Sequence, residues 1–281
     1  MNTTRLIEEV RDEVEAARAR GLRVGCVPTM GALHEGHLSL IRRARQECDY
    51  VLTTIFVNPT QFGPSEDLSK YPRPLETDLS LCREEQVDLV FHPDESTMYP
   101  PGESTVVDVG GLDSIWEGAH RPGHFRGVST VVAKLFNIVW AHDAYFGQKD
   151  YQQQLLIRRM CKDLCLPVRI QTCPIVRDPD GLALSSRNVY LSDEERQSAL
   201  ALSQSLKLAR EQLAAGKEPS AVRAAMLEHL NGTSNVAEQY ATVADAETLE
   251  ELDHVRSEMV ALVAAKVGST RLIDNELISL E

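Results

Sequence analysis

Short apolar runs alternate with amphipathic stretches over residues 22–176. The runs that we expect to be strands cover residues 23–27, 50–57, 89–91, 144–146 and 168–172. Between them, apolar residues recur every three or four positions, which predicts helices over residues 38–47, 75–85, 128–139 and 152–164. Strands that alternate with helices are typical of an α/β fold, so we predict a Rossmann-like, doubly wound, mainly parallel sheet.

A different pattern begins near residue 176, where the segment RDPDG at residues 177–181 predicts a turn. Ser192 and Glu195 form a capping-box pattern that opens a long helix, and Pro219 opens a second helix that ends near Gly232. Three strands are expected over residues 240–244, 260–266 and 270–273. We therefore predict two domains, residues 1–175 and a smaller α+β domain at residues 176–281.

The composition and the charge narrow the class of protein. Hydrophobic residues make up 43% of the chain, enough for a sizeable core, and the formal net charge of −13 disfavours nucleic acid and anionic lipid as partners. Residues 1–21 form a charged helical pattern without the apolar core of a signal peptide, and Lys266 interrupts the apolar stretch from Met259 before it could span a membrane. We expect a cytoplasmic protein whose six cysteines are buried thiols.

The most informative segment is VPTMGALHEGHL at residues 27–38, which follows a predicted strand and leads into a helix. Unpaired main-chain N–H groups at a helix start favour phosphate, so we expect a phosphate site here. His34 and His37 lie on one face of the first helical turn and can donate to the same ligand, although a histidine here could also only cap the helix. Gly31 and Gly36 leave room for a bulky nucleotide.

Two common nucleotide-binding motifs are absent from the sequence. No GxGxxG follows the first strand and no GxxxxGK[ST] occurs, which disfavours a dinucleotide dehydrogenase and a P-loop ATPase. The H-x-G-H pattern is that of nucleotidyltransferases and class I aminoacyl-tRNA synthetases, which cleave ATP between the α- and β-phosphates. The implied chemistry is adenylyl transfer.

The longer strings in the chain resemble one family in particular. PTMGALHEGH at residues 28–37 looks like the signature of the pantothenate synthetase family. Further similar strings follow in order: NPTQF at residues 58–62, RPGHFRGV at 121–128, FGQKDYQQ at 146–153 and LSSRN at 184–188. Their loop positions suit ligand contacts better than core packing.

This resemblance implies roles for the nucleotide-binding residues. It implies catalytic roles for His34, His37 and Lys149, with His37 as general acid, Lys149 on phosphate and Asp150 on ribose hydroxyls. The full set of implied ATP contacts is Met30, Gly31, Ala32, Leu33, His34, Glu35, Gly36, His37, Gly147, Gln148, Lys149, Asp150, Val176, Leu184, Ser185, Ser186 and Arg187. The family pattern has glutamate where this chain has Gln148. The second domain would close over the ATP site.

The resemblance also implies the substrates. Gln61 and Gln153 would hydrogen-bond pantoate, and Asn58 and Arg121 would complete the site for pantoate or β-alanine; an amide suits such ligands because it both donates and accepts. The implied reaction condenses pantoate with β-alanine, consumes ATP and releases pantothenate, AMP and pyrophosphate through a pantoyl adenylate. A homodimer is implied as well.

Some assignments stay open at this point. ATP is expected as its Mg²⁺ complex, with the ion held largely by phosphates and water, so no protein ligand is assigned. Asp78 could contribute to that site or could be a solvated helix charge. Two other functions compete: an adenylyl transferase that acts on a phosphorylated acceptor, and a nucleotide sensor without turnover.

Overall fold

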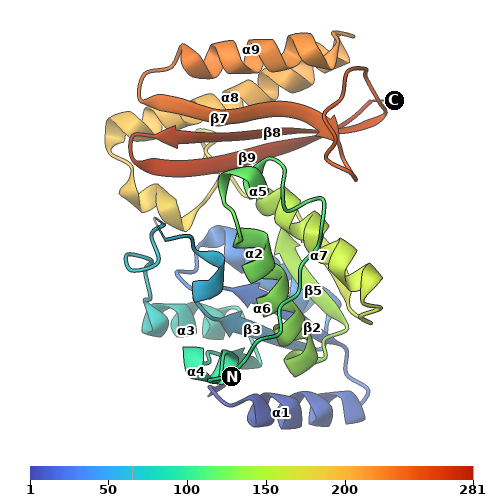
Figure 1. The fold of residues 1–281 in the computed structure, drawn as a ribbon. Helices are drawn as coiled ribbons and strands as arrows, with labels where there is room; N and C mark the ends of the chain where they lie inside the picture. The colour runs from blue at the N-terminus through green and yellow to red at the C-terminus, as the bar shows by residue number, and fades with distance from the viewer. Residues whose placement is uncertain (65, 281) are drawn as a thin grey trace. The chain divides into compact units, whose positions relative to one another are not determined.

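The computed structural model describes residues 1–64 and 66–280. The chain forms two compact units, each with a sheet of its own (Figure 1). The first unit contains residues 1–147 and 153–174, and the second contains residues 148–152 and 175–281. A short segment that follows a strand of the first unit therefore packs with the C-terminal unit.

Six parallel strands form the sheet of the first unit. They are β1 (Asn2–Thr4), β2 (Val24–Thr29), β3 (Tyr50–Ile55), β4 (Leu89–Phe91), β5 (Asp143–Gly147) and β6 (Arg169–Cys173). Their order in the sheet is β1-β4-β3-β2-β5-β6. The chain runs outward from β2 to β4 and then returns to β5, so the strand order reverses between β2 and β5. Open α/β sheets bind ligands beyond the carboxyl ends of the strands at such a switch point.

Helices cover both faces of this sheet (Figure 1). They are α1 (Ile7–Ala19), α2 (Glu35–Glu47), α3 (Leu75–Glu84), α6 (His124–Val139) and α7 (Tyr151–Asp163), with the short α4 (Glu95–Met98) and α5 (Glu117–His120). α2 and α3 pack on the face to which Val27 and Tyr145 point. On the other face, Phe136 of α6 meets Phe146 of β5 edge to face. Tyr145 and Phe146 point to opposite faces of the sheet, because the side chains of successive strand residues alternate between the two faces.

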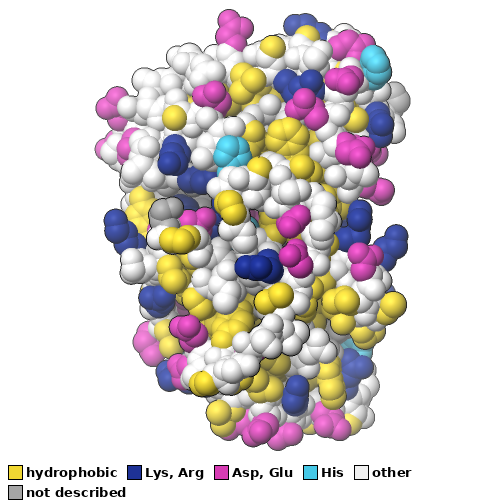
Figure 2. Space-filling view, in the orientation of Figure 1, with side chains coloured by type: hydrophobic (Ala, Val, Ile, Leu, Met, Phe, Trp, Pro, Cys, Tyr) yellow, Lys and Arg dark blue, Asp and Glu magenta, His cyan; other side chains and the backbone are white. Residues whose placement is uncertain are grey.

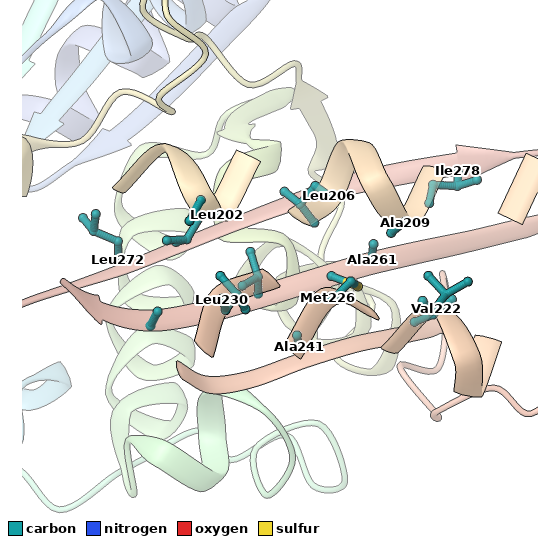
Figure 3. Close-up of a cluster of buried hydrophobic side chains, with 14 of the residues drawn as sticks. Leu202, Leu206, Ala209, Val222, Met226, Leu230, Ala241, Ala261, Leu272 and Ile278 are labelled. Atoms are coloured by element: carbon teal, nitrogen blue, oxygen red, sulfur yellow. The ribbon is translucent and has the colours of Figure 1, made fainter. Parts of the chain in front are cut away.

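Two helices and an antiparallel sheet make up most of the second unit. They are α8 (Asp193–Ala214), α9 (Pro219–Asn231), β7 (Val236–Asp245), β8 (Glu258–Val267) and β9 (Thr270–Ser279). Figure 3 shows the core between them, in which Leu206, Met226 and Ala261 are buried. The predicted capping box starts α8: Ser192 Oγ accepts from the Glu195 N–H, and the Glu195 carboxylate accepts from the Ser192 N–H. This local signal therefore sets the start of the longest helix.

The predicted fold class is confirmed, and three smaller expectations are wrong. Residues 2–4 form β1 rather than the start of a helix, because they pair with β4. β9 continues past residue 273, because Asp274 and Asn275 interrupt the apolar pattern but are buried and hydrogen-bonded. Cys165 is exposed, whereas the other five cysteines are buried as expected.

Charged side chains of both signs share the face seen in Figure 2. Lysine and arginine side chains lie scattered there among aspartate and glutamate. A chain with a formal net charge of −13 would need its basic residues gathered in one patch to bind nucleic acid. On this face the basic residues are scattered. Within residues 1–64 and 66–280, no helix combines the length and the apolar character that crossing a membrane requires.

Candidate active site

Two of the predicted ATP-binding loops leave neighbouring strands of the parallel sheet. The first follows β2 after Thr29 and leads into α2, and the second follows β5 after Gly147. β2 and β5 pair in parallel, so both loops begin at the carboxyl edge of the sheet. They also begin where the strand order reverses, which is the expected ligand position in this fold.

A buried carboxylate holds the loop after β2. Asp78 of α3 is 1% exposed and accepts hydrogen bonds from the main-chain N–H groups of Ala32 at 2.9 Å and Leu33 at 2.8 Å. Burial raises the pKa of Asp78, and the two N–H groups oppose that rise. Gly31 has a φ of +79°, and a Cβ at this position would lie 2.8 Å from Asp78 Oδ2. Asp78 is therefore not a solvated helix charge, because it anchors the loop.

The two histidines of the H-x-G-H segment cap the helix that they begin. His34 is the N-cap residue of α2, and its Nδ1 accepts from the Gly36 N–H at 3.1 Å. His37 Nδ1 accepts from the His34 N–H at 3.4 Å, and the ring centroids lie 4.2 Å apart. Because each Nδ1 is an acceptor, the proton of each neutral ring is on Nε2. Capping and phosphate binding are thus compatible roles of the same side chains.

These contacts change which groups can donate to a phosphate. The N–H groups of His34 and Gly36 pair with imidazole nitrogens, and those of Ala32 and Leu33 pair with Asp78. The premise that the main-chain N–H groups of this segment are unpaired is therefore wrong for these four residues. These main-chain contacts use Nδ1 of each imidazole and not Nε2.

A second polar cluster surrounds Gln61, in the short helix η1 (Pro59–Gln61) after β3. Gln61 Oε1 accepts from Asn58 Nδ2 at 3.1 Å, and Gln61 Nε2 lies 3.0 Å from Met30 Sδ. Asn58 is 1% exposed and also accepts from the Tyr99 hydroxyl at 2.7 Å. Asn58 thus orients the Gln61 amide, and Met30 brings the loop after β2 into contact with it.

The predicted R-P-G-H-F loop supports this cluster. Arg121 donates to both carboxylate oxygens of Glu66, at 2.8 and 2.7 Å, and to His124 Nε2 at 3.0 Å. His124 Nδ1 in turn donates to the main-chain carbonyl of Gln61 at 2.8 Å. Burial, and after it the charge of Arg121, lowers the pKa of His124 to about 4, so this ring is neutral. The guanidinium of Arg121, which was expected to bind substrate, pairs with Glu66 and His124. Through His124 it supports the Gln61 segment.

The loop after β5 forms the single turn η2 (Gln148–Asp150), which belongs to the second unit. Lys149 is half-buried and Asp150 is exposed. The main-chain carbonyls of Gln148 and Lys149 both accept from Asn275 Nδ2 at 2.9 Å. Asn275 is not among the residues that the sequence singles out, and its one signal is a polar residue within an apolar strand.

The predicted Ser-Ser-Arg turn also lies in the second unit, at the start of η3 (Ser186–Tyr190). Ser185 Oγ accepts from the Arg187 N–H at 3.3 Å and so caps this turn. A short hairpin leads to it, closed by a hydrogen bond of 3.0 Å from the Leu184 N–H to the Val176 carbonyl. Gln153, in α7, is half-buried and belongs to the first unit. The predicted ATP residues are thus divided between the two units.

Known proteins resemble this chain over nearly its whole length. A family model described as "Pantoate-beta-alanine ligase" matches residues 2–277. The chain belongs to the pantoate-beta-alanine ligase family. A pantothenate synthetase from Roseiflexus sp. (strain RS-1) is 60% identical over 252 residues, which make up 89% of this chain and 91% of that protein.

Solved structures agree with this family. The crystal structure of a pantothenate synthetase from Thermus thermophilus matches with a TM-score of 0.93 and 46% identity, and the match covers 98% of this chain and 99% of that one. A pantoate-beta-alanine ligase from Francisella tularensis, complexed with Beta-gamma ATP and Beta-alanine, matches with a TM-score of 0.82 and 33% identity over 99% and 97% of the two chains. The predicted family, enzyme class and ligase reaction are confirmed.

The described residues fit a resident metal ion poorly. Within residues 1–64 and 66–280, no three His, Cys, Asp or Glu side chains gather as a metal site would require. The Asp78 carboxylate is already paired with two main-chain N–H groups, one on each oxygen.

Proposed function

We propose that this pantoate-beta-alanine ligase works in two steps through a pantoyl adenylate. ATP first transfers AMP to the pantoate carboxylate and releases pyrophosphate. The amine of β-alanine then attacks the acyl carbon and displaces AMP. The order follows from the leaving groups, because oxide leaves a carboxylate poorly whereas AMP leaves a mixed anhydride readily.

The pair of imidazoles at the start of α2 is the observation that carries the first step. His34 and His37 both accept main-chain N–H groups at Nδ1, so both present Nε2–H as a donor. Negative charge grows on phosphorus oxygens and on pyrophosphate as the adenylate forms. Preorganised donors at such a charge lower a barrier by roughly 2.7–4 kcal/mol each. We assign both Nε2–H groups to phosphate oxygens, with His37 as the candidate general acid.

Further ATP contacts are proposed on chemical grounds. Lys149 adds a positive charge for phosphate, Asp150 suits ribose hydroxyls, and the Ser185–Arg187 turn offers hydroxyl donors and a cation. We propose that ATP enters with Mg²⁺ held by its phosphates and by water.

A cytoplasmic homodimer is the assembly that the family resemblance implies.

The proposed contact with pantoate depends on the orientation of the Gln61 amide. Asn58 donates to Gln61 Oε1, and one N–H of Gln61 Nε2 points to Met30 Sδ, so we assign the second N–H of Nε2 to the hydroxyl and carboxylate oxygens of pantoate. Gln153 is the proposed second contact. Once the adenylate is held, positioning the amine against it can supply roughly 7–11 kcal/mol, so the second step needs little further chemistry.

Isotope exchange tests this route directly. With ATP, Mg²⁺ and pantoate but no β-alanine, the enzyme should exchange labelled pyrophosphate into ATP. After full turnover, ¹⁸O from the pantoate carboxylate should be found in AMP. An adenylyl transferase for a phosphorylated acceptor would show no exchange that depends on pantoate, and a sensor would show no turnover. Unlabelled AMP would refute the adenylate.

A further inference from the structure

The loop that carries Lys149 is held by one buried amide of β9. Asn275 is 2% exposed, and its Nδ2 donates to the main-chain carbonyls of Gln148 and Lys149, each at 2.9 Å. Its Oδ1 accepts from Gln148 Nε2 at 3.2 Å. An asparagine amide has two N–H donors and a carbonyl acceptor. Both donors and the acceptor are thus used on this one loop.

Asn275 is not a packing residue of the core shown in Figure 3. Leu272 and Ile278 of β9 point into that core. Asn275 is three residues from each of them, and strand residues an odd number apart point to opposite faces. Its side chain therefore lies on the other face of the sheet, and the hydrogen bonds that it makes there go to the Lys149 loop.

The residue before it anchors the second ATP-binding turn of this unit. Asp274 is 4% exposed and accepts from both terminal nitrogens of Arg177, at 2.6 and 3.0 Å. Arg177 Nη1 also donates to the Gly181 carbonyl at 3.1 Å, which braces the hairpin that leads to Ser185. Adjacent residues of one strand thus hold both loops.

We propose that Asn275 is a positioning residue that sets where Lys149 meets the phosphates of ATP. This inference rests on the proposed contact between Lys149 and the nucleotide. Two hydrogen bonds to successive carbonyls fix the peptide between Gln148 and Lys149, and with it the direction in which the Lys149 side chain leaves the backbone. Without the amide, both carbonyls lose their partner and the peptide can rotate. Binding of the triphosphate then weakens, whereas binding of pantoate does not change.

A double-mutant cycle tests whether Asn275 acts through Lys149. Calorimetric titration with β,γ-methylene ATP is carried out on the wild type, Asn275→Ala, Lys149→Ala and the double variant. Asn275→Ala should weaken binding about tenfold in the wild-type background and less than about twofold in the Lys149→Ala background, because the two residues share one effect. The affinity for pantoate should stay the same in all four proteins.

A matched control lies in the same cross-strand row. Thr242 pairs with Leu262, which pairs with Asn275, and Thr242 Oγ1 donates to Glu251 at 2.8 Å. Thr242→Val removes a part-buried hydrogen bond from the same face of the sheet without touching the Lys149 loop. It should bind the analogue like the wild type. Asn275→Asp keeps the side-chain volume if the alanine variant does not fold, and it should weaken binding as well, because a carboxylate oxygen would face two carbonyls.

Each outcome decides the proposal. Equal analogue affinity of Asn275→Ala and Thr242→Val, or the same loss in both Lys149 backgrounds, overturns the positioning role. A Lys149→Ala variant that binds the analogue like the wild type overturns it too, because there is then no contact to position. If the cycle behaves as expected but pyrophosphate exchange does not depend on pantoate, the adenylate route fails and the positioning role of Asn275 stands.

Discussion

The loop after β2 and the loop after β5 are held by opposite kinds of hydrogen bond: the first loop donates to its anchor, and the second accepts from its anchor. Asp78 accepts from two consecutive N–H groups of the first loop, whereas Asn275 donates to two consecutive carbonyls of the second. The first loop turns through Gly31 and Ala32, which both have positive φ, and directs its N–H groups to Asp78. The second is a single 3-10 turn whose carbonyls face β9. The anchor thus has to match the group that each turn presents.

This contrast separates anchoring from ligand binding. A buried main-chain group without a partner costs about 1–3 kcal/mol, so a short loop has to be paired before its side chains can act. In the first loop, where Asp78 pairs with the N–H groups, the proposed phosphate contacts are the imidazoles. In the second, pairing by Asn275 leaves the proposed phosphate contact to Lys149. The two anchors, Asp78 and Asn275, are therefore different residues from those that we propose contact the ligand.

The largest expected effect tests the imidazoles of the first loop. His37→Ala should slow adenylate formation about 100- to 1000-fold, because it removes a preorganised donor from the phosphate. His34→Asn is the sharper partner variant, since asparagine is a good N-cap residue and keeps the helix start while the Nε2 donor is lost. Rapid-quench assays with circular dichroism measure both. A rate within about threefold of the wild type in either variant contradicts the assignment.

The second-largest expected effect is a loss of folding stability at acid pH, because His124 supports the Gln61 cluster. The pKa of His124 falls from 6.5 to about 4 on folding, because burial disfavours its charged form. The unfolded chain thus binds this proton at a higher pH than the folded chain, so stability is full above pH 6.5 and falls as the pH drops towards 4. The loss amounts to about 3 kcal/mol for one group.

Urea unfolding between pH 7 and pH 4 measures this loss. His124→Asn is the matched variant, because asparagine can still donate to the Gln61 carbonyl but does not titrate. The wild type should lose more stability than the variant over this interval. Parallel curves for the two proteins would show that folding does not lower the pKa of His124.

The anchor of the first loop should have a smaller effect on stability. Asp78→Asn keeps one acceptor for Ala32 or Leu33 but turns an NH₂ group towards the other N–H, so about 2 kcal/mol of stability should be lost. Glu76→Gln is the control, since Glu76 is exposed on the same helix. Urea midpoints of the two variants give the difference. Equal midpoints would mean that the comparison between Asp78 and Asn275 as loop anchors is wrong.

The smallest expected effect concerns substrate selection. Gln61→Ala should weaken pantoate about tenfold and leave ATP unchanged, because it leaves a polar group of pantoate without its partner. Calorimetric titration with each ligand measures both affinities. The control is Asn137→Ala. It removes a different amide of the first unit, which donates to the Ala133 carbonyl of its own helix. Equal losses for ATP and pantoate would show general damage to the unit.

Local sequence patterns predicted which segments form helices and which form strands. The errors occur where a residue's environment depends on distant parts of the chain. β4 and the start of α8 agree with the sequence, because an apolar run and a capping box are signals within a few residues. β9 runs past its predicted end, because Asp274 and Asn275 break the apolar pattern while partners elsewhere in the chain satisfy them. Asp78 is the same case: its environment depends on a loop 46 residues away.

The sequence by itself determined the α/β class, most strands and helices, the family and the strings that carry the proposed chemistry, because hydrophobic periodicity, caps and motifs are local. Only the tertiary structure decided how those strings are held. It showed that Nδ1 of both histidines accepts a main-chain N–H, that Arg121 pairs with Glu66, and that Asn275, 126 residues from Lys149, anchors its loop. Such pairings depend on which distant backbone groups a strand order brings within hydrogen-bond reach, and no local pattern records that.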